Sequence, residues 1–365
     1  MVKPMRLGVA VDLGSAAKVR PQVDRAARLL ETAEENGLSS VWLGESYHVR
    51  PEPFHLPAVL MVLAHLAGRT GLPLGTAVLL ARAYEPRRLA YEAALLDQLC
   101  GGRLTLGLAL GNPDLVERFG VRTEGRRPAQ WFESFVTTLR ETWSAAPAAE
   151  GTGSGAAGGA AGGQDPGQGP APVMPPPLRP GGPPLLLGGR TRAAVLRAAT
   201  VGDGYYAATN YGDGLLAARA AEYREARAGE PGEVAVTRLC LVSEDGEQAR
   251  KEATRYFASV LDYYTRRRAW MGVDGPEEPA LSLVGSPDEV AAALRRYAAA
   301  GVTSVQLRVA PYGTPPEVAR RTLRMVGTAV LPELGDIVQE RPVQQGPAQE
   351  APAQSDTFTE RRTLG

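Results

Sequence analysis

The chain has 365 residues, of which 44% are hydrophobic and 22% are charged, so it can bury one large core or two smaller ones. Lys plus Arg and Asp plus Glu each total 40, so the formal net charge is zero. The chain as a whole therefore has no positive charge that would favour binding to nucleic acid or an anionic membrane. Two cysteines without a C-x-x-C spacing and three histidines argue against a disulfide framework or a metal centre.

The start of the chain carries no predicted targeting segment. It runs directly into a strand, without a charged leader followed by an apolar core. No run of about eighteen apolar residues occurs in the sequence, so no transmembrane helix is predicted. We therefore expect a soluble cytoplasmic protein.

Strands and helices alternate in the first part of the chain. The clearest unit is a strand at Leu74–Leu80, a helix that begins at Pro86 and ends before Gly101-Gly102, and a second strand at Arg103–Leu108. Strands joined in this way are parallel, with a right-handed crossover. The other elements predicted here are strands at Arg6–Val11 and Ser39–Gly44 and helices at Pro21–Asn36, His55–Gly68 and Arg126–Trp143.

Two segments lack the composition of a packed core. Residues Ala145–Pro184 consist almost entirely of Gly, Ala, Pro and Gln, which predicts a flexible surface insertion. We interpret it as a spacer, with a partner-binding segment or a lid as the alternative. The polar tail is predicted to be disordered. The chain is thus expected to form one domain over residues 1–335, interrupted at 145–184, with a tail at 336–365.

The alternation resumes after the insertion. Ser286 and Glu289 form a predicted capping box, with proline at the first helical position, for a helix at Pro287–Ala300. A second capping box, from Thr314 to Glu317, is predicted to start the final helix. The remaining elements are strands at Pro183–Gly189, Gly202–Thr209, Val234–Ser243 and Thr303–Val309 and helices at Thr191–Thr200 and Glu247–Tyr264.

Eight strands, each followed by a helix, favour an α/β fold of the TIM (β/α)8 barrel type over two dinucleotide-binding halves. In a TIM barrel the chemistry lies at the carboxyl ends of the strands. The residues expected there are Asp12, 45–50, 76–82, 111–114, 188–192, 210–211, Arg308 and 311–312.

Four stretches carry a resemblance to a known family. They read VWLGESYH at 41–48, LGTAVLL and its continuation at 74–111, RFG at 118–120, and PPLLLGGRTRAAVLRAATVGDG at 183–204. The run LDQLCGGRLTLGL within the second stretch is the most specific. With these stretches, residues 5–330 apart from the insertion resemble the bacterial-luciferase-like family of flavin-dependent oxidoreductases. The resemblance implies a TIM barrel that binds reduced FMN or the deazaflavin F420, and a homodimer formed through barrel helices.

The resemblance also implies a site for the flavin ring. Thr76, Ala77 and Val78 would form a bulge with a non-prolyl cis peptide against the back of the ring. A plain buried strand explains the same composition equally well.

Two further segments are implied to hold the rest of the cofactor. Gly188, Gly189, Arg190 and Thr191 lie between a strand and a helix, where free amide groups and the helix dipole suit a phosphate. Arg190 or Arg192 would add charge. A second segment, Gly111-Asn112, would contact the ribityl chain or the phosphate. Ordinary turns are the alternative for both segments.

The family's catalytic motif is only partly present. Luciferases have Glu-His-His where this chain has Glu45, Ser46 and Tyr47, and His48 is displaced from the family position. His48 is the predicted general acid or base, Tyr47 a hydrogen-bond donor to a substrate oxygen, and Glu45 the group that orients them. A histidine in a surface loop is the alternative. Leu110 replaces an arginine that pairs with the FMN phosphate in luciferases, and this leaves room for F420.

Three functions remain open. The first is a monooxygenase that uses reduced FMN, supplied by a separate reductase, and oxygen on a small organic substrate. The second is an F420-dependent dehydrogenase or reductase that transfers hydride. The third is a non-catalytic flavin-binding barrel. No metal is expected in any of them.

Overall fold

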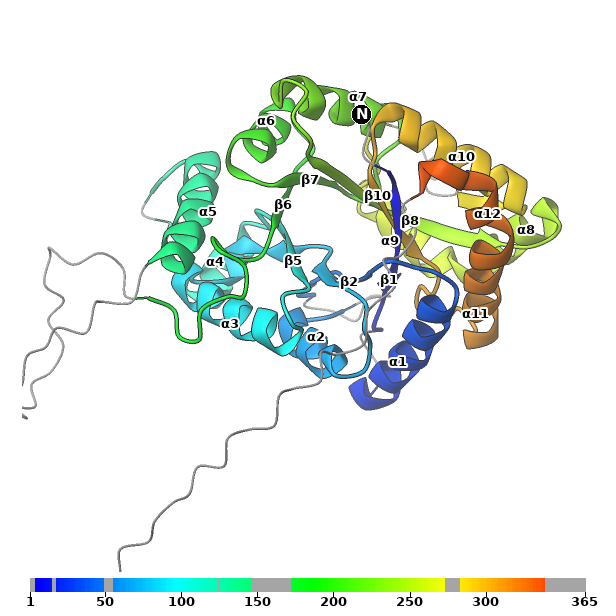
Figure 1. The fold of residues 1–365 in the computed structure, drawn as a ribbon, viewed down its shortest axis with the longest axis horizontal. Helices are drawn as coiled ribbons and strands as arrows, with labels where there is room; N and C mark the ends of the chain where they lie inside the picture. The colour runs from blue at the N-terminus through cyan, green and yellow to red at the C-terminus, as the bar shows by residue number, and fades with distance from the viewer. Residues whose placement is uncertain are drawn as a thin grey trace, which may run out of the picture.

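The computed structural model describes residues 4–14, 18–48, 55–123, 125–145, 172–272 and 283–338 of the chain. At its centre, parallel strands close into a barrel with helices around it (Figure 1). Each barrel strand pairs with the next, and the last pairs with the first. In this order the strands are β1 (Arg6–Val11), β2 (Val41–Leu43), β3 (Leu74–Thr76), β5 (Leu104–Ala109), β6 (Leu185–Gly188), β7 (Gly204–Ala207), β8 (Glu233–Val242) and β10 (Ser304–Arg308). The eight predicted strands and the TIM barrel are confirmed.

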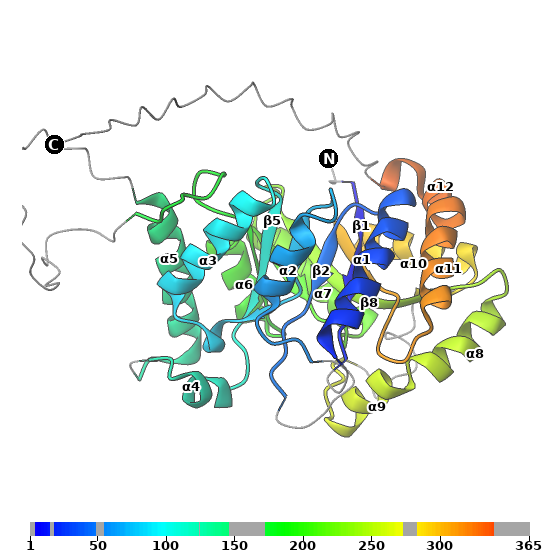
Figure 2. The ribbon, with the colours of Figure 1, turned by 90° about the horizontal axis from the view of Figure 1, so that it is seen from below.

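Most of the helices cover the outside of the barrel (Figure 1). They are α1 (Val19–Glu35), α2 (Val59–Ala67), α3 (Pro86–Leu99), α4 (Asp114–Phe119), α5 (Pro128–Ser144), α6 (Arg192–Val201), α7 (Asp213–Ala226), α8 (Gly246–Tyr256), α9 (Ala258–Arg266), α10 (Pro287–Ala300), α11 (Pro316–Met325) and α12 (Leu331–Leu334). Figure 2 shows the chain start at one end of the barrel and α4 and α9 at the other. Because α4 follows β5 directly, the end with α4 is the one where the strands finish.

Side chains of the strands alternate between the helix layer and the barrel interior. In β1, Leu7 and Val9 are 1% and 0% exposed and belong to the main hydrophobic core. Between them, Gly8 faces the interior, where a Cβ atom would lie 2.3 Å from the side chain of Gln306. The interior is therefore packed at this level, and space for a ligand exists only nearer the strand ends.

Two of the elements that differ from their predictions follow the start of β8. The helix expected at Glu247–Tyr264 is divided at Phe257 into α8 and α9. The Phe257 side chain is fully buried in a small hydrophobic cluster that is separate from the main core, and this anchors the break. A further strand, β9 (Leu283–Gly285), was not predicted. It pairs with the last three residues of β8. Because β8 has ten residues, its end extends beyond β10 and is available for this pairing.

Only one of the two predicted capping boxes forms. Ser286 Oγ accepts from the Glu289 amide and the Glu289 carboxylate accepts from the Ser286 amide, as expected. The second prediction is wrong. Helix α11 begins at Pro316, which leaves Thr314 one position too early to cap it, and Thr314 Oγ1 is buried without a hydrogen-bond partner.

The last part of the predicted insertion packs against the barrel helices. Residues 146–171 and the tail from 339 lie outside the described residues, but residues 172–184, assigned to the flexible segment, pack against α3. Val173 is 3% exposed, and the Leu178 amide donates to Asp97 Oδ2 at 2.9 Å. The prediction failed because a Pro-rich segment can be held by the helix it crosses, and composition does not reveal that contact. No helix in the described part of the chain is long and apolar enough to cross a bilayer.

Candidate active site

A small cavity, here called the barrel mouth, opens where the barrel strands end. Its volume is about 110 Å³. The residues around it come from loops after several strands and from α9, as expected for the functional end of a TIM barrel. Its polar lining consists of Asp12, Glu45, Ser46, His55, Thr209, Thr237, Tyr264 and Arg308.

Asp12 and Arg308 form a buried ion pair in the barrel mouth. Arg308 Nε donates to Asp12 Oδ2 at 2.6 Å, and Arg308 Nη1 donates to the Tyr264 hydroxyl at 3.3 Å. Burial raises the pKa of Asp12 in spite of the guanidinium beside it. Burial acts to lower the pKa of Arg308, but Asp12 and Tyr264 together raise it. Arginine stays protonated under such conditions, so the pair positions two polar groups at little net charge.

The predicted bulge lies at the mouth. A non-prolyl cis peptide joins Ala77 and Val78, and Ala77 lines the cavity. Two glycines make room for this backbone. A Cβ atom on Gly44 would lie 2.7 Å from the Ala77 carbonyl oxygen, and one on Gly107 would lie 2.1 Å from the Thr76 carbonyl oxygen. The cis peptide expected from the sequence is confirmed, between the second and third residues of the predicted segment.

Glu45 is a buried acceptor beside the mouth. Its Oε1 accepts from the hydroxyls of Tyr47, at 2.8 Å, and Tyr84, and its Oε2 accepts from the Leu80 amide at 3.0 Å. Burial raises the pKa of Glu45, and these hydrogen bonds only partly offset that effect. Burial and the nearby Glu45 raise the pKa of Tyr47 to about 12. Tyr47 also accepts from the Ala58 amide at 3.2 Å, so one carboxylate ties together the loop after β2, the start of α2 and the segment before α3.

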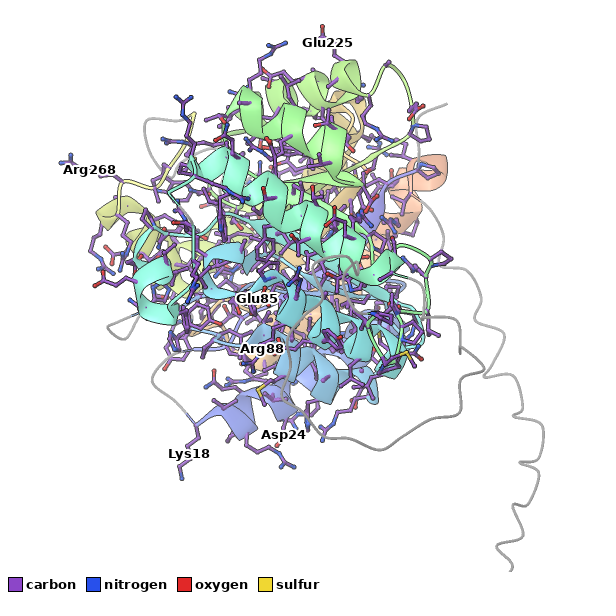
Figure 3. The ribbon with its side chains drawn as sticks, turned by 90° about the vertical axis from the view of Figure 1, so that its left-hand side faces the viewer. Lys18, Asp24, Glu85, Arg88, Glu225 and Arg268 are labelled. Atoms are coloured by element: carbon purple, nitrogen blue, oxygen red, sulfur yellow. The ribbon has the colours of Figure 1, made fainter. Side chains whose placement is uncertain are left out.

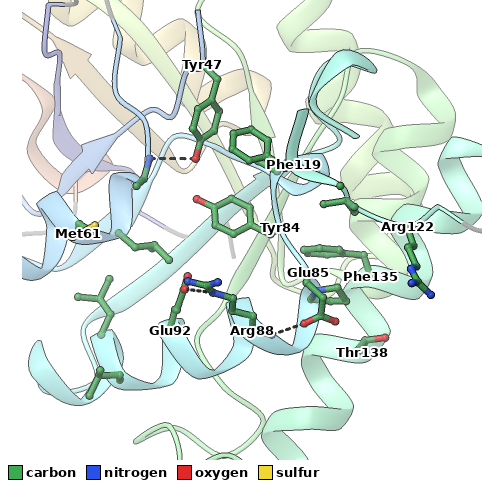
Figure 4. Close-up of a pocket in the computed structure, with 18 of the residues that line it drawn as sticks. Tyr47, Met61, Tyr84, Glu85, Arg88, Glu92, Phe119, Arg122, Phe135 and Thr138 are labelled. Atoms are coloured by element: carbon green, nitrogen blue, oxygen red, sulfur yellow. Dashed lines mark hydrogen bonds and ion pairs between the residues drawn. The ribbon is translucent and has the colours of Figure 1, made fainter. Parts of the chain in front are cut away.

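Tyr47 faces away from the mouth. Its ring lies 4.8 Å from that of Phe119, and both rings, with Tyr84, line a larger cavity outside the barrel (Figure 4). This outer groove has a volume of about 980 Å³ and lies among α2, α3, α4 and α5. Figure 3 looks onto this side of the molecule, with Glu85 and Arg88 near its centre. Although the outer groove is the larger cavity, it lies away from the other strand ends, and we regard the mouth as the candidate active site.

The two histidines of this region have different positions. His48 does not line the mouth, and its ring lies 5.5 Å from that of Tyr263. His55 does line the mouth, and its Nδ1 accepts from the His48 amide at 3.2 Å. This bond assigns the proton of a neutral His55 ring to Nε2. The imidazole nearest the strand ends is thus one that the sequence analysis did not select.

The segment predicted to hold a phosphate begins at the end of β6. Thr191 caps α6, with its Oγ1 accepting from the Ala194 amide at 3.2 Å. A Cβ atom on Gly189 would lie 2.5 Å from that of Ala194, so only glycine lets the backbone approach the helix start so closely. Arg190 is exposed at the surface beside it. A helix start with a cation nearby matches the chemistry of a phosphate site.

Gly111 and Asn112 follow the neighbouring strand. Residues Leu108 and Leu187 are paired in β5 and β6, so Gly111 and the phosphate segment leave the barrel side by side. Gly111 has φ +80°, and its carbonyl oxygen accepts from Arg82 Nη1 at 2.9 Å. Arg82 therefore places a cation beside Gly111. The neighbouring Leu110 offers no charge and packs against the core.

Four polar lining residues of the mouth were not singled out by the sequence analysis: His55, Thr209, Thr237 and Tyr264. The rule that chemistry follows strand ends could have found Thr209, which comes two residues after β7. The other three reach the mouth from a loop before a helix, from within a strand and from α9, and no local sequence signal marks them. Within the described residues, no group of three or more His, Cys, Asp or Glu side chains could hold a metal.

Comparison with known proteins gives a family. A model of the family described as luciferase-like monooxygenase matches residues 5–304. One curated relative, the oxygenase component of a flavin-dependent trigonelline monooxygenase from Acinetobacter baylyi, is 33% identical over 126 residues, or 33% of either chain. The match spans about a third of that relative's length.

Solved structures extend the similarity to nearly the whole fold. Monooxygenase RslO1 from Streptomyces bottropensis matches with a TM-score of 0.69 and 25% identity, over 90% of this chain and 99% of that one. The coenzyme F420-dependent tetrahydromethanopterin reductase from Methanopyrus kandleri matches with a TM-score of 0.65 and 17% identity, over the same shares of the two chains. The second similarity shows the fold alone.

Proposed function

The chain belongs to the luciferase-like monooxygenase family, and from this premise we propose that it is a flavin-dependent monooxygenase acting on a small organic substrate at the barrel mouth. The observation that carries the proposal is the placement of three backbone features around one end of the barrel. These are the bulge at Ala77-Val78, the turn at Gly111 and the segment Gly188–Thr191. The identity to a flavin-dependent oxygenase component supports the reaction class.

The residues present fit a flavin phosphate. A Cβ atom on Gly189 would lie 2.5 Å from that of Ala194, so glycine lets the chain approach the start of α6 closely, and the helix start with Arg190 beside it suits a phosphate. In this proposal Gly188, Gly189, Arg190 and Thr191 hold the phosphate of reduced FMN, Gly111 and Asn112 contact its chain, and Thr76, Ala77 and Val78 support its ring. When bound, the reduced flavin would supply the electrons that activate oxygen.

For proton transfer we propose Glu45, Tyr47 and His48 together with His55. Glu45 lines the mouth, and its raised pKa keeps a proton on the carboxyl to higher pH than usual, as a proton donor requires. Tyr47 holds that carboxyl in place. His48 positions the His55 ring through its amide, and His55 lines the mouth.

F420-dependent hydride transfer is the second candidate. The observation that favours it is Leu110, whose apolar side chain packs against the core where luciferases have an arginine for the FMN phosphate. The fold shared with an F420-dependent reductase is compatible with this reading.

The proposal includes two partners. A separate reductase would deliver the reduced flavin, in line with the description of the curated relative as an oxygenase component. A second copy of the chain would form a homodimer through helices of the barrel, as the family resemblance implies. The cytoplasmic location stays a prediction.

Titration of the purified protein with FMN, reduced FMN, F420 and reduced F420 tests the proposal. We expect micromolar binding of reduced FMN. Arg190→Gln should weaken it about tenfold, because a charge-assisted contact to phosphate is lost. Binding of reduced riboflavin, which lacks the phosphate, should not change. Arg197→Gln is the matched control, because Arg197 lies on α6, the helix that follows Arg190, and pairs with Glu133 instead of facing the proposed phosphate site.

The alternatives give different results in the same titration. Binding of F420 without either form of FMN would overturn the monooxygenase proposal in favour of hydride transfer. Failure to bind any of the four compounds would overturn both enzyme proposals and leave the non-catalytic barrel.

A further inference from the structure

A third cavity lies beside the barrel mouth but outside it. It has a volume of about 460 Å³ and lies between α1, α11 and the loop that joins β10 to α11. The two cavities share Val11 and Asp12 at the end of β1. No part of the proposed flavin site lines this third cavity, which we call the side cavity.

The walls of the side cavity are held in place by contacts of their own. Gln22 of α1 accepts from the Gly14 amide and donates to the Gly14 carbonyl oxygen, which fixes the chain just after β1. A Cβ atom on Gly14 would lie 2.1 Å from the Tyr312 ring, so this ring rests directly on the Gly14 backbone. Hydrogen bonds and packing therefore fix the shape of the cavity wall.

Two arginines give the side cavity a positive charge. Arg25 of α1 and Arg320 of α11 both line it, and neither makes an ion pair or a side-chain hydrogen bond within the described part of the chain. The only carboxylate among the lining residues is Asp12, and Arg308 already neutralises it. Two guanidinium groups without a counter-charge favour an anion between them.

A buried hydroxyl lies in the same wall. Thr314 lines the side cavity and is only 7% exposed, and its Oγ1 has no hydrogen-bond partner. A buried polar group without a partner costs free energy, which a ligand acceptor would recover. The rest of the lining is mainly apolar, from Ala26, Leu29, Ala310, Pro311, Pro315, Pro316 and Ala319.

We propose that the side cavity binds a small organic anion, a carboxylate on an apolar body. The carboxylate would lie between Arg25 and Arg320, with the Thr314 hydroxyl donating to it or to a neighbouring oxygen. The apolar body would cover the proline and alanine surface between α1 and α11. The apolar lining favours such an acid over inorganic phosphate, which has no apolar part to bury. The ligand would lie next to the Asp12–Arg308 pair without entering the mouth.

Calorimetric titration of the full chain with sodium benzoate at constant ionic strength tests this site. We expect roughly millimolar or tighter binding, and at least tenfold weaker binding of the uncharged benzyl alcohol. The double variant Arg25→Gln with Arg320→Gln should lose about tenfold in affinity for benzoate. Thr314→Val, which removes the hydroxyl and keeps the shape, should weaken binding by a smaller factor. Arg28→Gln is the control, because Arg28 is an exposed arginine of α1 that does not line the cavity.

Two outcomes would overturn the site. One is the absence of benzoate binding. The other is binding that the double variant does not weaken, which would place the anion elsewhere, for example in the mouth near Arg308. Circular dichroism of each variant checks that it is folded. None of these measurements uses a flavin, so the result is independent of the proposed function.

Discussion

At the scale of single residues, Glu45 shows how one side chain serves both fold and site. It lines the mouth, and its two oxygens also accept three hydrogen bonds, from Tyr47, Tyr84 and Leu80. The sequence analysis expected Glu45 to orient its neighbours, and the contact with Tyr47 is of that kind. It expected no contact with Tyr84, which is far along the chain.

Two substitutions at Glu45 separate its charge from its hydrogen bonds. Glu45→Ala should lower the free energy of unfolding by about 3 kcal/mol, because the half-buried Leu80 amide and the tyrosine hydroxyls lose their acceptor. Glu45→Gln keeps an acceptor and should cost less. Urea denaturation of both variants measures these changes, and equal losses would contradict the role of the acceptor.

The pH dependence of the same two proteins tests the raised pKa. The pKa of Glu45 in the folded chain lies above its ordinary 4.5, so the folded chain holds this proton more tightly than the unfolded chain does. The stability that comes from the proton is present below 4.5 and is lost as the pH rises through the folded value. Gln cannot ionise, so the free energy of unfolding of Glu45→Gln should increase relative to that of the wild type as the pH rises from 4.5. If the difference in free energy of unfolding between the two proteins does not change above pH 4.5, burial does not dominate the pKa of Glu45.

At the scale of elements, the loop between β3 and β4 (Leu79–Leu80) depends on glycines in its neighbours. Gly44 follows β2 and Gly107 lies within β5, and both leave space for the carbonyl groups of the bulge. The strand β5 pairs with β3 before the bulge and with β4 after it, so it supports both sides of the break.

Substitution of Gly107 should therefore destabilise the fold through the bulge. In Gly107→Ala the new methyl group would lie 2.1 Å from the Thr76 carbonyl oxygen and 3.0 Å from Val78, and backbone must move to accept it. We expect a loss of about 2 kcal/mol or more, together with weaker flavin binding. Gly214→Ala is the control, because nothing lies within 4 Å of its added methyl group. It should gain about 0.5 kcal/mol. Equal stability of the two variants in denaturation would show that the bulge does not need this glycine.

At the scale of the whole molecule, the outer groove carries an apolar surface that a single barrel leaves in water. Met61 of α2 is 75% exposed, and Leu95 and Leu99 of α3 are 49% and 58% exposed. All three line the outer groove. Apolar surface of this kind marks an interface more often than free surface, so we assign the proposed homodimer contact to it.

Charge placed on this surface should separate the dimer. We expect the wild type to sediment as a dimer and the variant Met61→Glu with Leu95→Glu to sediment as a folded monomer, because a dimer would bury the new carboxylates without partners. Val19→Glu, at an equally exposed apolar residue of α1, should stay dimeric. A monomeric wild type, or a double variant that stays dimeric, would contradict the assignment.

The sequence alone was sufficient for the barrel and for part of the site. Apolar spacing and glycine or proline at the ends of elements are local signals, and they predicted all eight barrel strands, the capping box at Ser286 and, with the family resemblance, the bulge at Ala77-Val78. Only the tertiary structure placed His55 at the mouth, turned Tyr47 toward the outer groove and left Thr314 without a partner. These positions depend on contacts between residues far apart in the chain, or on where a helix actually begins. No local pattern encodes such contacts, because burial and partnership are decided only when the elements pack together.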